Sequence, residues 1–243
     1  MLESSAAQQT KFLEEWERAG TAKVDAFLAP QSLSELQTAV EASYELLRRH
    51  ISDDPPTLNI HLADHFTRWD GIWVKELAGF LDRFSPEIRE LFDRAISSAE
   101  ARFRSLFDEN WRLEPKFTFI RRHQSTRHYL PWHIDADAAS IIYTTDYCIN
   151  VWLPLDPVGE VAPSLELLPS SNKTMRNLPI VAEGEKMRTD EWVKDNIGTH
   201  SWTPHALPGD AILFDHWTLH RTQRIAGEQV KRTSCEFRFV RIA

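Results

Sequence analysis

Two periods of apolar residues divide the sequence near residue 115. In the first part, apolar residues recur every three or four positions, which is the spacing of amphipathic helices. The stretches with this spacing are 11–20, 32–51, 71–84 and 87–111. Ser85 and Pro86 place a capping residue and a proline where the last of these helices should begin. Residues 1–114 are therefore predicted to be mostly helical and to support the rest of the chain.

After residue 115 the chain consists of short β-prone runs separated by proline, glycine, serine and aspartate. These runs are 117–124, 140–155, 164–169, 211–217 and 232–242. No linker rich in glycine or serine separates the two halves, so we expect one domain, 1–243, in which helices pack on a barrel or two-sheet sandwich at 115–243. The long polar segment around 173–202 interrupts the strands and is predicted to be a lid.

Composition argues against several classes of protein. A net charge of -8 and a pI near 5.7 disfavour a general nucleic-acid-binding protein, because such a protein needs a basic surface to displace counterions from phosphates. Cys148 and Cys235 are too few for a disulfide framework or a four-thiolate zinc site, and we expect them to be buried thiols. The first 20 residues do not have the pattern of a signal peptide, and no apolar run approaches the roughly 18 residues that cross a bilayer. We therefore expect a cytoplasmic protein without membrane or nucleic-acid partners.

The first candidate for chemistry is the pair His133 and Asp135, in the run Pro-Trp-His-Ile-Asp. Two residues apart on a strand, both side chains would lie on one face and could chelate one ion. An imidazole with a carboxylate suits Fe(II) or Mn(II), and a second histidine would complete a facial triad. Taken alone, such a pair is common by chance and is more often exposed or hydrogen-bonded in a core.

His220 is the best candidate for the second histidine. It follows a Pro-Gly-Asp turn at 208–210 and the apolar run Ala-Ile-Leu-Phe, and a hairpin there could bring it beside residue 133 in a closed barrel. His216, four residues earlier, is a rival ligand, but the spacing favours His220. The alternative for His220 is a buried histidine whose ring is hydrogen-bonded within the core.

Arg232 and Ser234 open the final apolar strand, 12 residues beyond His220. On a strand they lie on one face, so they can present a guanidinium group and a hydroxyl to the far carboxylate of a dicarboxylic co-substrate. The alternative for Arg232 is an exposed salt bridge.

The order of these motifs resembles that of the phytanoyl-CoA dioxygenase family over roughly residues 116–241. The shared features are H-x-D, a Gly-Asp turn, a histidine ten residues after that aspartate, and Arg-x-Ser. The run CINVWLPL at 148–155 is similar to the strand after the family's metal motif, and SLELLPSSN at 164–172 is similar to its Leu-x-x-x-Pro-Gly-Ser-His stretch. The resemblance implies a mainly β fold with flanking helices, whose core is a double-stranded β-helix (jelly-roll, cupin-like). It also implies an oxygenase that requires iron(II), 2-oxoglutarate and dioxygen.

Carried over residue by residue, the resemblance assigns roles to the matching positions. The iron ligands correspond to His133, Asp135 and His220, and the residues at the far carboxylate of 2-oxoglutarate correspond to Arg232, Ser234 and Trp152. Halogenating members would have a small residue in place of Asp135, so this carboxylate favours oxygenation, with hydroxylation of a small molecule and release of succinate and CO2. The chain departs from the family pattern in one loop, where Pro163 and Ser170 replace glycine and Asn172 replaces histidine.

Candidate substrate residues precede the metal motif. Arg121 and Arg122 alternate on a strand, so only one of them can face inward, where it could hold an anionic group. His123 and Tyr129 are placed similarly, and ordinary exposure is the alternative for each. Two rival functions remain open: a β-barrel protein that binds or senses metal without turnover, and a cupin-type metal enzyme that does not use 2-oxoglutarate. The Arg-Thr-Ser run at 232–234 counts against the second.

Overall fold

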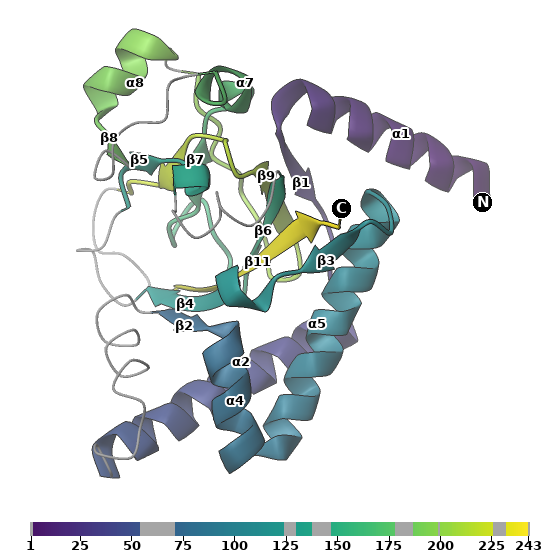
Figure 1. The fold of residues 1–243 in the computed structure, drawn as a ribbon, viewed down its shortest axis with the longest axis vertical. Coiled ribbons are helices and arrows are strands. Elements are labelled where there is room, and N and C mark those ends of the chain that lie inside the picture. The colour runs from purple at the N-terminus through teal and green to yellow at the C-terminus, as the bar shows by residue number, and fades with distance from the viewer. Residues whose placement is uncertain are drawn as a thin grey trace.

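The fold consists of two antiparallel β-sheets with helices packed on one of them (Figure 1). The computed structural model describes residues 2–53, 71–123, 130–137, 147–177, 187–198, 200–225 and 232–242. In these residues the larger sheet has the order β1 (Thr21–Val24), β9 (Ala211–Asp215), β6 (Cys148–Pro154), β11 (Arg232–Arg241), β4 (Phe119–His123) and β2 (Gly71–Trp73), with β3 (Trp111–Leu113) also paired to β11. The smaller sheet has the order β7 (Leu165–Leu167), β10 (His220–Thr222), β5 (Trp132–His133) and β8 (Met187–Arg188).

From β4 onward the chain passes repeatedly between the two sheets. Strands β4, β6, β9 and β11 lie in the larger sheet, whereas β5, β7, β8 and β10, which separate them in sequence, lie in the smaller one. The predicted double-stranded β-helix (jelly roll) stays a prediction. The predicted class, a β core with flanking helices, is confirmed.

The helices cover the outer face of the larger sheet. They are α1 (Leu2–Ala19), α2 (Pro30–Asp53), α4 (Val74–Phe84) and α5 (Pro86–Leu106), and Figure 1 shows the last three gathered on one side of the strands. On β11, Cys235, Phe237 and Phe239 point toward the helices and belong to the main hydrophobic core. The ring of Phe239 stacks on that of Phe103 in α5 at a centroid distance of 3.8 Å. Period-2 alternation thus places one face of β11 on the helices and the other in the interior.

Three short strands, β1, β2 and β3, lie within the region predicted to be mostly helical. Gly71–Trp73 was expected to begin a helix but forms β2, because it pairs with β4, and α4 starts only at Val74. Residues Thr21–Val24 form β1 by pairing with β9 at the edge of the larger sheet. Gly20 makes the turn from α1 into β1 with φ +63°, and a Cβ there would lie 2.5 Å from the side chain of Asn172. Long-range pairing therefore overrides the local helical pattern at Gly71–Trp73 and forms a strand between two helices at Thr21–Val24.

The segment predicted to be a lid contains regular structure where it is described. Helix α7 (Ser171–Met175) follows β7, and α8 (Asp190–Asn196) follows β8, which pairs with the metal-motif strand β5. Residues 178–186 and 199 lie outside the described residues, and the lid role stays a prediction. Cys148 and Cys235 are both free and buried. Among the residues that the structure describes, no helix is long and apolar enough to span a membrane.

Candidate metal centre

Two antiparallel strands of the smaller sheet position the two histidines. His133 of β5 and His220 of β10 are directly opposite each other in the strand register. The sequence predicted that a hairpin would bring His220 beside His133. In the structure, β9 and β10 do not pair with each other. They lie in different sheets, and the chain crosses from one to the other over 216–219. His220 therefore reaches His133 by a sheet crossing rather than by a hairpin.

Asp135 does not continue the strand of His133. Strand β5 ends at His133, and Asp135 begins a short 3-10 turn, η2 (Asp135–Asp137). The backbone N–H of Ala136 donates to the carbonyl of His216, in the segment that crosses between the two sheets, at 2.9 Å, and this contact holds the turn. The expectation of two side chains on one face of a strand was therefore wrong in its geometry, although the carboxylate still faces both imidazoles.

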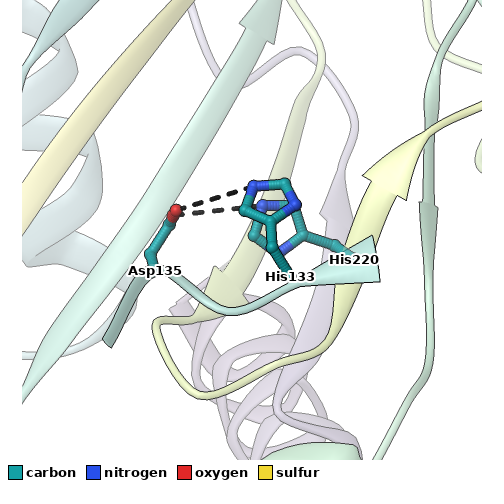
Figure 2. Close-up of side chains that lie close together, drawn as sticks. All are labelled: His133, Asp135 and His220. Carbon is teal, nitrogen blue, oxygen red and sulfur yellow. Dashed lines mark ion pairs between the residues drawn. The ribbon is translucent and has the colours of Figure 1, made fainter. Parts of the chain in front are cut away.

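The three side chains converge on one point, as Figure 2 shows. One oxygen of Asp135, Oδ1, lies 3.9 Å from His133 Nε2, and Oδ2 lies 4.0 Å from His220 Nε2. One ligand atom from each residue lies within 4.8 Å of the other two. Two imidazole nitrogens and one carboxylate oxygen are the donor set of a facial triad, which leaves coordination positions free for other ligands. The residues present therefore fit an Fe(II) ion.

Backbone carbonyls fix the orientation of both rings. His133 Nδ1 lies 2.8 Å from the carbonyl of Pro131, and His220 Nδ1 lies 3.0 Å from the carbonyl of Thr218. Since a carbonyl only accepts, each Nδ1 carries the proton, and each Nε2 keeps its lone pair for a metal. Burial, assisted by the neighbouring His220, lowers the pKa of His133 to about 4. Burial also lowers the pKa of His220, so both rings are neutral near pH 7.

Asp135 is held from the larger sheet. Its Oδ2 accepts a hydrogen bond from Asn150 Nδ2 at 2.7 Å and lies 3.1 Å from an Nη atom of Arg238. Burial is the largest single influence and acts to raise the pKa of Asp135, but Arg238, the two histidines and Arg121 together outweigh it, and the pKa lies below its ordinary value. Asp135 is therefore an anion at neutral pH, as a metal ligand must be.

Arg232 lies on the same inward-facing side of β11 as Arg238, six residues earlier in that strand. It is buried with a relative exposure of 1%, and its guanidinium carbon lies 4.9 Å from the ring centre of Trp152. One Nη atom donates to the carbonyls of Pro163 and Ser164. No carboxylate of the described residues lies within ion-pair distance of Arg232. The expected alternative, an exposed salt bridge, does not apply.

Several buried polar atoms around Arg232 have no hydrogen-bond partner among the described residues. They are Nε of Arg232, Oγ of Ser234, Nε1 of Trp152 and Oγ of Ser164. Buried polar groups are nearly always hydrogen-bonded, so a cluster of unpaired donors around a cation is the arrangement expected of an anion-binding site. The far carboxylate of 2-oxoglutarate fits this chemistry.

A small cavity of about 40 Å³ opens onto the metal ligands. Its wall includes Arg121, which lies 3.6 Å from Glu236, while Arg122 points to the opposite face and pairs with Glu41 of α2. Of the two arginines, only Arg121 can therefore contact a ligand in the cavity. His123 ends β4, but its side chain and the whole of Tyr129 lie outside the described residues.

The rival histidine and the divergent loop lie away from the ligands. His216 is buried with its Nδ1 2.8 Å from the carbonyl of Cys148, and it is not part of the group that could hold a metal. Ser170, which replaces the family's glycine, has φ +67°, a left-handed conformation that favours glycine. Asn172 packs on Gly20 and donates to Asp215 at 3.3 Å. The departures at Ser170 and Asn172 therefore affect the packing of α7 against α1 and β9, whereas Pro163 lies at Arg232, which donates to its carbonyl.

Sequence reasoning did not single out Asn150, Glu236 or Arg238, although all three surround the ligands. A signal for two of them was present, because Glu236 and Arg238 continue the alternation of Arg232 and Ser234 on one face of the last strand. Asn150 is the register partner of Arg238 on β6. Its contact with Asp135 depends on tertiary structure.

Comparisons with known proteins agree with this geometry. A family model described as phytanoyl-CoA dioxygenase (PhyH) matches residues 16–233. Among solved structures, AviO1 from Streptomyces viridochromogenes Tue57 is similar with a TM-score of 0.62 and 16% identity, covering 96% of this chain and 94% of that one. The epimerase SnoN in complex with Fe3+, alpha ketoglutarate and nogalamycin RO has a TM-score of 0.64 and 14% identity, covering 97% and 84%.

A third similar structure is EctD from S. alaskensis with 2-oxoglutarate and 5-hydroxyectoine, with a TM-score of 0.62, 15% identity, and coverage of 97% and 76%. A search of curated proteins gives no match. At these identities the structural likeness establishes the fold, while the family match covers most of the chain.

Proposed function

The chain belongs to the phytanoyl-CoA dioxygenase family, and on this premise we propose that it hydroxylates a small-molecule substrate. Enzymes of this class are Fe(II)- and 2-oxoglutarate-dependent oxygenases. The observation that carries the proposal is the convergence of His133, Asp135 and His220 beside a cavity. In the overall reaction a substrate C–H bond becomes C–OH, and 2-oxoglutarate and O2 become succinate and CO2.

The three ligands have distinct tasks. His133 and His220 supply neutral nitrogen donors whose Nε2 atoms face the same point, and Asp135 supplies one negative charge. Bound Fe(II) together with 2-oxoglutarate supplies the oxidation, in which one oxygen atom of O2 enters succinate and the other enters the product. The surrounding residues orient the ligands and exclude water.

We assign the far carboxylate of 2-oxoglutarate to Arg232, with Ser234 and Trp152 beside it. The support is the set of unpaired donors described above, because a buried cation without a carboxylate partner is costly unless an anion joins it. Arg121 is a weaker candidate for this role, since Glu236 lies 3.6 Å from it. Burial lowers the pKa of Arg232 to about 9, so the side chain remains charged at neutral pH.

Arg121 is our candidate for a substrate contact. It lies on the cavity wall near the metal ligands, and its side chain is about one-fifth exposed. Apolar lining comes from Phe119, Leu130, Leu165 and Phe214. This combination suits a small molecule with an apolar body and an anionic group.

Succinate formation tests the proposal. Purified protein with Fe(II), ascorbate and 2-oxoglutarate should release succinate, and a panel of candidate substrates should increase the rate. His133→Ala should abolish both succinate release and metal binding, whereas His205→Ala, an exposed histidine, should change neither. If no condition yields succinate and His133→Ala binds metal like the wild type, the proposal is wrong. Metal binding without succinate would favour the sensing protein, and product formation without 2-oxoglutarate would favour the cupin-type enzyme.

A further inference from the structure

The two oxygens of Asp135 have different surroundings. Oδ2 is within hydrogen-bonding distance of both Asn150 Nδ2, at 2.7 Å, and an Nη atom of Arg238, at 3.1 Å. Asn150 donates a hydrogen bond to Oδ2, and the guanidinium of Arg238 forms an ion pair with the same oxygen. Oδ1, which lies 3.9 Å from His133 Nε2, accepts no hydrogen bond from the described residues. The carboxylate is therefore prepared to bind a metal through one oxygen.

Asn150 and Arg238 are rigidly placed for this contact. They are paired in register on the adjacent strands β6 and β11 of the larger sheet, and both side chains are buried. His133 and His220 come from the smaller sheet. Asp135 lies in a 3-10 turn instead of a strand, so it has no strand register of its own to fix its position. Asn150 and Arg238 tie its carboxylate to the larger sheet, opposite the histidines.

We propose that Asn150 and Arg238 are positioning residues that hold Asp135 as a monodentate metal ligand. The proposal rests on the iron site proposed above and deepens it. Outer-shell partners of this kind typically change metal affinity by about 10- to 100-fold when removed. Arg238 forms an ion pair with Asp135, whereas Arg121, on the same cavity wall, contacts Glu236 but not Asp135.

The arrangement has a direct consequence for a variant without the carboxylate. In Asp135→Gly, Asn150 and Arg238 would still present an amide N–H and a cationic N–H to the vacated volume. Formate has the size and charge of the missing carboxylate group, so it should bind there and restore the third ligand. Removing Arg238 would relieve its repulsion of the metal ion and so would favour metal binding. Formate binding, by contrast, needs the positive charge of Arg238, so the test separates the two effects.

The experiment measures Co(II) binding to the full chain without oxygen, using the visible ligand-field absorption of Co(II) and a calorimetric titration. Asp135→Gly should bind Co(II) weakly, and added formate should restore both the affinity and the wild-type spectrum in a saturable manner. The formate requirement is the formate concentration that restores half of the Co(II) binding. In Asp135→Gly/Arg238→Met this concentration should rise by roughly tenfold or more. Asp135→Gly/Asn150→Leu should show a smaller rise. The control, Asp135→Gly/Arg112→Met, removes an exposed arginine away from the cavity and should behave like Asp135→Gly.

Two outcomes would overturn the proposal: restoration by formate that does not depend on Arg238, and no restoration by formate in Asp135→Gly. If Arg238→Met prevents folding, Arg238→Lys in the Asp135→Gly background replaces it. Lysine keeps the charge but is shorter and lacks the planar fork, so the formate requirement should still rise. An unchanged requirement in that variant also contradicts the proposal.

Failure of this proposal is distinguishable from failure of the proposed function. If the wild type binds Co(II) and forms succinate with Fe(II) while formate restores Asp135→Gly equally with and without Arg238, only the positioning role is lost. If the wild type neither binds Co(II) nor forms succinate, the iron site itself is wrong.

Discussion

Two buried arginines on the same face of β11 have opposite surroundings. Arg238 lies 3.1 Å from Asp135 and 3.6 Å from Glu236, so its charge is matched by carboxylates of the protein. Arg232, six residues earlier, contacts carbonyls and the ring of Trp152 but no carboxylate of the described residues. One arginine therefore belongs to the protein's own charge network, and the other is the residue that we propose receives the far carboxylate of 2-oxoglutarate. Burial alone does not distinguish these roles, but the partners do.

The largest expected contrast is in the stability of the metal-free protein. Arg238→Met should lower the free energy of unfolding by about 3–5 kcal/mol, because Asp135 and Glu236 would lose a buried counter-charge. Arg232→Met should change it by no more than about 1 kcal/mol, since no carboxylate is left unpaired. Urea denaturation of both variants measures the difference. Equal losses would show that the two arginines are structurally equivalent.

Acid should act on His133 in the metal site and not on Arg232. His133 has a pKa of about 4 in the folded chain and about 6.5 when unfolded, so between these values the unfolded state binds more protons. Stability of the metal-free protein should therefore fall as pH decreases from 6.5 to 4, by on the order of 3 kcal/mol from this residue. Arg232, with a pKa of about 9, stays charged throughout this range.

Urea titrations at several pH values check this prediction, with His133→Gln as the non-titrating variant and His205→Gln as the exposed control. A pH slope that His133→Gln does not reduce would contradict it.

Affinity for 2-oxoglutarate should depend on Arg232, the arginine with the smaller expected effect on stability. Arg232→Met should weaken binding by about 2–3 kcal/mol, or roughly 30- to 150-fold, because the far carboxylate would lose its cation. Arg121→Met, which removes a cation on the cavity wall, should change it less than about threefold. Calorimetric titration of the Co(II)-loaded protein without oxygen gives both values. A larger loss for Arg121→Met than for Arg232→Met would move the co-substrate site to Arg121.

Ser234→Ala should give the smallest effect. If its unpaired hydroxyl donates to the same carboxylate, its removal should weaken 2-oxoglutarate binding by about 1 kcal/mol, or roughly fivefold. The stability of the metal-free protein should stay within about 0.5 kcal/mol of the wild type, because no hydrogen bond in the described structure is lost. The same titration, together with urea denaturation, tests it. An unchanged affinity would leave Arg232 and Trp152 as the remaining candidates at this carboxylate.

The sequence by itself determined the features that depend on local periodicity. Helical spacing predicted α2 and α5, and period-2 alternation placed Arg232 and Ser234 on one face of β11. The spacing of the metal motif and the distant histidine identified the residues that the structure brings together. These patterns need only neighbouring residues, because side-chain direction follows directly from the backbone repeat.

Tertiary structure decided what depends on partners far away in the chain. Pairing with β4 made Gly71–Trp73 a strand, and a hydrogen bond from Ala136 to His216 holds the turn that places Asp135 outside β5. The same is true of the two arginines in β11. Their alternation is visible in the sequence, but their partners come from other strands and turns, so only the folded chain shows that Arg238 is matched by carboxylates and that Arg232 is not. The physical reason is that a buried charge is defined by the groups that surround it, and those groups are brought together by folding.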